Sequence, residues 1–274
     1  MGNLWKGFKE HRTFRFTSLL VILLIALVVL APVIAPYNPL EAVMKDANQA
    51  PSMAHLFGTD KLGRDVLSRI LYGGAYSLSS VLALVVIIFC VGTFLGLVAG
   101  YFGGLIDTVI MRIADMMISF PGVILAIAIA GIMGGSLVNA MIALTAVTWT
   151  KYARLSRSMV LKIRKRDFVD AAIVSGGTSS HILWTHIMPN VVPILVITAV
   201  SDIGAMMMEL AGLSFLGFGS QPPAPEWGLM LNEGRQQLQT APWLMVFPGL
   251  AIFISVVIFN LWGDALRDLS LIHI

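Results

Sequence analysis

Long uncharged apolar runs constrain this chain more than any other feature of its sequence. A helix needs about 20 apolar residues to cross a hydrocarbon core of about 30 Å, and several runs in the 274 residues reach that length or exceed it. Only 12% of the residues are charged, about half of the share in a soluble domain. The sequence therefore predicts an all-α, polytopic membrane protein.

Glycine and proline divide the apolar runs into six expected transmembrane helices. The first covers residues 16–36; it is too long for a signal-peptide core and no small-residue cleavage site follows it, so we expect a retained anchor. Glycine-rich turns at 100–104 and 134–136 separate later spans. The other five spans are expected at about 75–99, 112–133, 137–157, 188–211 and 243–262.

The distribution of Lys and Arg predicts the orientation. With six spans, thirteen of the 18 Lys and Arg residues fall on one side of the membrane and five on the other. Cytoplasmic segments are the ones enriched in these residues. We therefore expect the N-terminal segment 1–15 and both termini in the cytoplasm, and the loop 37–74 outside. The single cysteine, Cys90, excludes a disulfide framework.

The segment 162–189 carries the most specific local pattern. Gly176 and Gly177 permit a tight turn, Thr178, Ser179 or Ser180 can cap a following helix, and Pro189 can open the next span. Before the turn, apolar and small side chains share one helical stripe: Phe168, Val169, Ala172 and Ile173. This pattern predicts a short cytoplasmic helical hairpin. Because basic residues precede it, a helix lying on anionic lipid is the alternative interpretation.

The same segment resembles a known family. Asp170-Ala171-Ala172, then Gly176 and Pro189, is similar to the EAA signature of permease subunits of bacterial ABC importers, with Asp170 in place of the usual Glu and His186 in place of an apolar residue. Further segments resemble the dipeptide, oligopeptide and nickel branch of that family: 57–60, 63–69, 99–104, 111–115, 120–121, 213–219 and 263–268. The tail 269–274 departs from the family pattern, and we expect it to be an artefact.

This resemblance implies a type I ABC importer permease fold, with a permease domain at 75–268. A coupling helix would place five residues in a cleft of a separate ATPase subunit: Phe168, Asp170, Ala171, Ala172 and Gly176. The implied partners are a second homologous permease, two ATPase subunits that hold ATP and Mg²⁺, an extracytoplasmic solute-binding protein and the bacterial inner membrane. The chain itself is not expected to be an enzyme, to carry a cofactor or to bind nucleic acid.

Asp202 and Glu209 are the acidic residues of the expected fifth span. They lie seven residues apart, on one helix face and about 10 Å apart along the axis. A carboxylate at a helix centre costs about 2.5–3.5 kcal/mol, so it usually faces a cavity or a partner. One interpretation is a cation path that Asp202, Glu209 and Met206 line. The other is structural, with Glu209 at the outer mouth and Asp202 bonded to Ser or Thr groups or to a partner subunit.

The identity of the substrate stays open at this point. Residues 202–204 and 226–235 are most similar to nickel-importer permeases, so nickel, free or chelated, is the first expectation, with dipeptides or oligopeptides as the alternative. The methionines 206–208 favour packing over metal ligation, and we assign no metal site. A proton-coupled carrier is a hypothesis from another class, against which the hairpin argues.

Two smaller expectations concern single side chains. Arg112 and Asp115, three residues apart, are expected to form an ion pair on one helix. Trp227 is expected at the membrane interface, where the amphipathic indole ring is enriched.

Overall fold

The computed structural model describes residues 12–271, and within that range the chain is helical, with one isolated bridge between Thr59 and Asp65. The expectations for residues 1–11 and 272–274 lie outside the described residues. The elements are α2 (Arg12–Val29), α3 (Ala31–Ile34), η1 (Met44–Asp46), α4 (Val66–Phe102), α5 (Gly104–Ile118), α6 (Gly122–Met133), α7 (Leu137–Ile163), α8 (Asp167–Val174), α9 (Ser179–Ile182), η2 (Leu183–Ile187), α10 (Met188–Phe215), α11 (Trp227–Gly234), η3 (Arg235–Gln237) and α12 (Trp243–Leu271).

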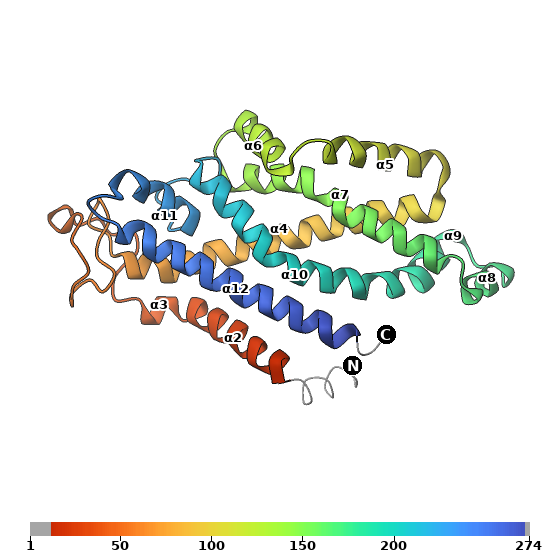
Figure 1. Cartoon of the computed structure of the whole chain (residues 1–274), viewed down its shortest axis with the longest axis horizontal. Helices are drawn as coiled ribbons and strands as arrows, with labels where there is room; N and C mark the ends of the chain where they lie inside the picture. Colours follow the sequence, from red (N-terminus) through yellow and green to blue (C-terminus); the bar gives the residue numbers. More distant parts are fainter. Residues whose placement is uncertain (1–11, 272–274) are drawn as a thin grey trace.

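The long helices run along the long axis of the molecule (Figure 1). Helices α4, α7, α10 and α12 form the bundle, and α2 packs against α12 at its edge. Helix α11 and the loop between α3 and α4 lie at one end, and α8 and α9 project from the other. Helix α2 begins and α12 ends toward the end that carries α8 (Figure 1).

Fewer helices qualify as transmembrane spans than the six expected. Within residues 12–271, four helices are long and apolar enough: Arg12–Val29, Val66–Phe102, Ser179–Phe215 and Trp243–Ser270. The expected span at 112–133 is interrupted, because Pro121 has no N–H to continue the helix, and α5 and α6 meet there at 93°. Taken as one bent span, this pair brings the number to five.

Helix α7 accounts for the remaining expected span, at 137–157. It is helical throughout this segment but is not among the helices that qualify by composition. The reason lies in its second half, where Lys151, Arg154 and Arg157 follow one another at intervals of three residues. The chain is therefore a multi-helix membrane bundle, in which six spans are not confirmed.

Three glycines let α4 and α7 approach closely. Gly92, Gly96 and Gly100 recur every fourth residue on one face of α4. A Cβ atom at Gly96 would lie 2.3 Å from the carbonyl oxygen of Ala153, and one at Gly92 would lie 2.5 Å from that of Trp149. Small residues at this spacing allow tight helix packing in membranes, where packing contacts rather than water exclusion drive association.

Replacing Gly96 by Ala should therefore destabilise the protein by about 1–3 kcal/mol, the usual cost of overpacking. The added methyl group meets a backbone oxygen that cannot move without shifting α7. Gly212→Ala is the matched control, because no atom lies within 4 Å of the position that its Cβ would take and alanine favours helices. Thermal unfolding of the detergent-purified variants measures both effects. A melting temperature of Gly96→Ala at or above that of Gly212→Ala would refute this account of the packing.

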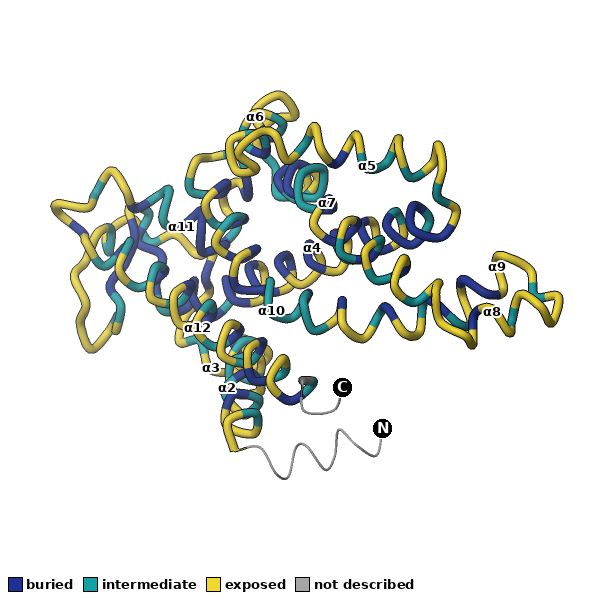
Figure 2. The backbone as a smooth tube through the Cα atoms, turned by 45° about the vertical axis from the view of Figure 1, so that its right-hand side comes forward, coloured by how far each residue is buried: buried dark blue, intermediate teal, exposed yellow. Residues whose placement is uncertain are grey.

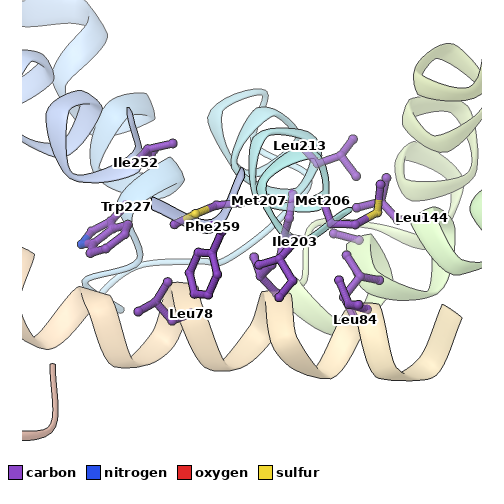
Figure 3. Packing of buried hydrophobic residues seen from close by; sticks show 14 of the residues in the cluster. Leu78, Leu84, Leu144, Ile203, Met206, Met207, Leu213, Trp227, Ile252 and Phe259 are labelled. Atoms are coloured by element: carbon purple, nitrogen blue, oxygen red, sulfur yellow. The ribbon is translucent and has the colours of Figure 1, made fainter. Parts of the chain in front are cut away.

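Helix α10 supplies the centre of the apolar core (Figure 3). Ile203, Met206, Met207 and Leu213 are all at most 6% exposed, and they pack among residues of the surrounding helices: Leu78, Leu84, Leu144, Trp227, Ile252 and Phe259. Met206 and Met207 thus serve packing, as expected, whereas Met208 is 56% exposed. Exposed residues dominate α5, α8 and α9, by contrast (Figure 2).

Candidate functional site

The hairpin of α8 and α9 lies at the end of the bundle, between α7 and α10 (Figure 1). Val169 anchors α8: its side chain is fully buried in a cluster with Ile182, Leu183 and Ile187 and with residues of α4. Most other side chains of α8 are exposed. Asp170 and Ala171 are exposed, and Val174 is 88% exposed.

The expected apolar stripe of α8 is divided between two faces. Ala172 packs toward the buried cluster beside Val169, but Phe168 is 46% and Ile173 is 52% exposed. The predicted stripe thus has a buried half and an exposed half. Val169 and Ala172 pack on the cluster, and α8 exposes its other large apolar side chains, Phe168, Ile173 and Val174.

The turn forms at the predicted glycines. Gly176 has a φ of +82°, a conformation that glycine adopts without strain, and the Gly177 N–H donates to the Ala172 carbonyl at 3.0 Å. Thr178 is the cap of the second helix, accepting from the His181 N–H at 3.3 Å. A π-helical turn, η2, then leads into α10, with Pro189 in its first turn. The predicted hairpin geometry is confirmed.

Ion pairs connect the helix that precedes the hairpin to its neighbours. Along α7, Arg154 pairs with Asp115 and Arg157 pairs with Asp107, both on α5. The predicted pair of Arg112 with Asp115 is therefore wrong, because the facing helix offers Asp115 a closer cation than its own helix does. Directly after α7, its C-cap residue Arg164 donates to the Tyr101 carbonyl of α4 at 2.9 Å.

Asp202 is held by α7. The Lys151 ammonium lies 2.7 Å from both carboxylate oxygens of Asp202, and the Tyr152 hydroxyl donates to one of them at 2.8 Å. The structural interpretation had named Ser or Thr groups or a partner subunit, and the observed partners are a lysine and a tyrosine of this chain. A path role for Asp202 stays a prediction.

Glu209 lies in different surroundings, although it shares the helix face of Asp202. Its half-buried carboxylate makes no hydrogen bond and no ion pair with any of residues 12–271. It borders a cavity of about 340 Å³ between α6, α7 and α10, whose other lining residues are apolar or glycine: Val123, Ala126, Ile127, Leu144, Met208, Gly212, Leu213, Phe215 and Leu216.

Sequence reasoning missed a buried ionic network at the other end of the molecule. Asp60 accepts from Arg64 Nε at 2.6 Å and from Arg69. Both arginines also reach Glu233 of α11, at 3.2 Å and 2.9 Å. The side chains of the two arginines are at most 3% exposed. The network fastens the loop before α4 to α11. The crowding of charges at 60–69 was the signal available in the sequence.

Trp227 is part of the same region and is only 3% exposed. Its indole N–H donates to the Ile70 carbonyl at 2.9 Å, so the ring fills the contact between α11 and α4, and its position at the membrane interface stays a prediction. Glu226 caps α11 through the N–H groups of Gly228 and Leu229 at 2.8 Å. Burial raises the pKa of the Glu226 carboxyl, and these two hydrogen bonds oppose that shift.

Metal-ligating side chains do not gather in the described part of the chain. No group of three or more His, Cys, Asp or Glu residues there could hold a metal ion. The ring centroids of His181 and His186 lie 5.7 Å apart in the hairpin region. No third residue of these types joins them within residues 12–271 to form a metal site.

Comparison with known proteins identifies similar sequences over nearly the whole chain. Residues 92–270 match the family model described as "Binding-protein-dependent transport system inner membrane component", and residues 1–51 match the "N-terminal TM domain of oligopeptide transport permease C". The glutathione transport system permease protein GsiD of Pectobacterium atrosepticum is 42% identical over 96% of this chain and 88% of its own.

Two other relatives are named for different solutes. The dipeptide transport system permease protein DppC of Alkalihalophilus pseudofirmus is 40% identical, covering 96% of this chain and 87% of its own. The nickel transport system permease protein NikC of Escherichia coli K12 is 42% identical, covering 92% and 91%. Among solved structures, the inward-facing MetNI methionine ABC transporter has a similar fold, with a TM-score of 0.53 and 20% identity over 71% of this chain and 95% of that one.

Proposed function

Because this chain belongs to the family of binding-protein-dependent transport system inner membrane components, we propose that it forms half of the translocation path of an ABC importer and couples that path to separate ATPase subunits. It is a multi-pass membrane permease with the type I importer fold. In this proposal ATP and Mg²⁺ are bound and ATP is hydrolysed on the partner subunits.

The hairpin of α8 and α9 is the observation that carries the coupling role. It combines an exposed face, on which Phe168, Asp170 and Ala171 lie, with a buried anchor at Val169. A push on that face reaches α7 and α10 directly, because the hairpin is continuous with both helices. Rigid-body movement of packed helices is an established way to open and close a central path. Asp170, Ala171, Ala172, Gly176 and Phe168 are the residues proposed to meet the ATPase.

The remaining partners follow from the same proposal. A second homologous permease completes the path, two ATPases engage the hairpins, and a solute-binding protein docks at the end that carries α11. The hairpin and the described ends of α2 and α12 point to one end of the molecule. Together with the Lys and Arg distribution, this supports cytoplasmic termini in the bacterial inner membrane.

Two substrates have support from specific observations. The local similarity of residues 202–204 and 226–235 to nickel-importer permeases favours nickel, free or chelated. The pairing of Asp202 with Lys151 favours small peptides, because it neutralises one of the two carboxylates that a bare cation would need. The relatives carry the names of both kinds of solute.

Crosslinking and uptake test the coupling role together. In a Cys90→Ser background, a single cysteine at position 171 should crosslink to the coexpressed ATPase. Vesicles that hold the full complex should take up solute only when ATP is present on the side of the membrane that carries the ATPase subunits. A cysteine at the exposed position 53, at the other end of the molecule, is the control. Uptake driven by a proton gradient without ATP would instead support a secondary carrier.

A further inference from the structure

A small cavity lies beside the buried ionic network at the α11 end of the molecule. Residues from three parts of the chain border it: Arg69 in the first turn of α4, Gln237 in η3 and Leu244 at the start of α12. Its volume is about 10 Å³. One ordered water molecule needs about 10–15 Å³, so the cavity has the size of a single water and is too small for a larger ligand.

Arg69 contributes an unused hydrogen-bond donor at this cavity. Its side chain is 2% exposed, and its two terminal nitrogens donate to Asp60 and Glu233. The third nitrogen, Nε, is buried and has no hydrogen-bond partner among residues 12–271. Buried polar groups in folded proteins are nearly always hydrogen-bonded, to protein or to ordered water. A group that occupies the cavity therefore has to accept a hydrogen bond from Arg69.

Gln237 contributes an unused acceptor at the same cavity. Its side-chain oxygen, Oε1, is buried and has no hydrogen-bond partner in the described part of the chain. The backbone carbonyl of Gln237 is already engaged, because it accepts from the N–H groups of Thr240 and Ala241 at 3.0 Å and 2.7 Å. The occupant of the cavity therefore has to donate a hydrogen bond to the Gln237 side chain as well.

These two requirements select the chemistry of the occupant. A chloride ion accepts hydrogen bonds but cannot donate one, and it would meet the carboxylates of Asp60 and Glu233, which border the same cavity. A metal cation cannot accept from the N–H group of Arg69. The network is also balanced in charge, because two arginines pair with two carboxylates. A neutral molecule that both donates and accepts, and that is no larger than water, satisfies every condition.

We propose that this cavity is the binding site of one ordered water molecule, which accepts from Arg69 Nε–H and donates to Gln237 Oε1. The ion pairs of the network reach α11 at Glu233, but within residues 12–271 they include no residue of η3. The water extends the network to η3 and thereby holds the turn between α11 and α12 against the start of α4. Gln237 is in this sense a positioning residue. The inference does not depend on the proposed import function.

Electron cryo-microscopy of the wild-type protein in lipid nanodiscs, at a resolution that shows ordered waters, identifies the occupant. One peak should lie at about 2.7–3.2 Å from both Arg69 Nε and Gln237 Oε1. Gln237→Leu removes the acceptor and should lose the peak, while Arg69 stays paired with Asp60 and Glu233. Gln236→Leu makes the same change at the exposed neighbouring residue and should keep the peak.

Thermal unfolding of the detergent-purified variants supplies a second readout. Gln237→Leu leaves the buried Nε–H of Arg69 without its bridging partner, and it should lower the melting temperature by about 2–8 °C. Gln236→Leu should shift it by less than about 2 °C, because surface substitutions have small effects.

Any one of three results would overturn the proposal. The first is a wild-type map with no peak between the two side chains, or with the Gln237 side chain in direct contact with Arg69. The second is an unchanged peak and an unchanged melting temperature in Gln237→Leu. The third is an anomalous bromide signal at the site in crystals grown with bromide in place of chloride, which would identify an anion. The wild-type map decides the occupant even where Gln237→Leu fails to fold.

Discussion

Replacing Asp60 by Asn should destabilise the protein by about 3–5 kcal/mol, the usual cost of removing one partner from a buried ionic network. Asp60 is 6% exposed and is the shared acceptor of Arg64 and Arg69. Its carboxylate also accepts from the backbone N–H groups of Leu62 and Arg64, at 2.9 Å and 3.0 Å. Without the charge, Glu233 is the one carboxylate of residues 12–271 that still pairs with the two buried guanidinium groups.

Denaturation of the detergent-purified protein, followed by tryptophan fluorescence, measures this effect. Trp227 and Trp243 are suitable probes, because both contact the region: Trp227 donates to Ile70, and Trp243 donates to the Thr59 carbonyl at 3.2 Å. Glu41→Gln removes an exposed acid of the same loop and should change the stability by less than about 0.5 kcal/mol. Equal stabilities of the two variants would show that the network contributes little.

Replacing Ala171 by Trp should abolish ATP-dependent uptake while leaving the stability of the isolated permease within about 0.5 kcal/mol of wild type. Ala171 lies on the exposed side of α8, so the larger side chain displaces no residue of this chain. It would instead fill the space in which a partner backbone approaches. Copurification of the ATPase and uptake in vesicles are the two measurements.

The control for this variant places the same bulk far from the hairpin. Met53→Trp changes a residue that is 96% exposed at the opposite end of the molecule, and it should retain both the ATPase and uptake. If Ala171→Trp also retained both, α8 would not be the contact with the ATPase. A helix that rests on anionic lipid would then be the better interpretation of the basic segment before it.

The hairpin shows what a sequence predicts well. Its turn depends on the backbone freedom of Gly176, its second helix on a cap at Thr178, and its end on Pro189, and all of these act on neighbours within a few residues. The close contact of α4 with α7 could have been predicted in the same way. Gly92, Gly96 and Gly100 repeat at a spacing that is visible in the sequence and typical of tight membrane packing.

The spans show what pattern reasoning left open. An uncharged run predicts apolar surroundings, but it does not say whether the helix continues, and Pro121 divides α5 from α6 inside one such run. The expected span at 137–157 contains three cations of α7, Lys151, Arg154 and Arg157. Their role became visible only with their partners, Asp202, Asp115 and Asp107, on two other helices.

The sequence by itself determined the helical membrane class, the family and the local shape of the hairpin, because hydropathy, glycine turns and caps act over short distances along the chain. Only the tertiary structure decided which charges meet. Arg64 reaches Glu233 across 169 residues, and Lys151 reaches Asp202 across 51. Each cation could pair with several acids, and the choice depends on which helices pack side by side. For the same reason, only the folded chain distinguishes Asp202, which pairs with Lys151, from Glu209, which has no ion-pair partner among residues 12–271.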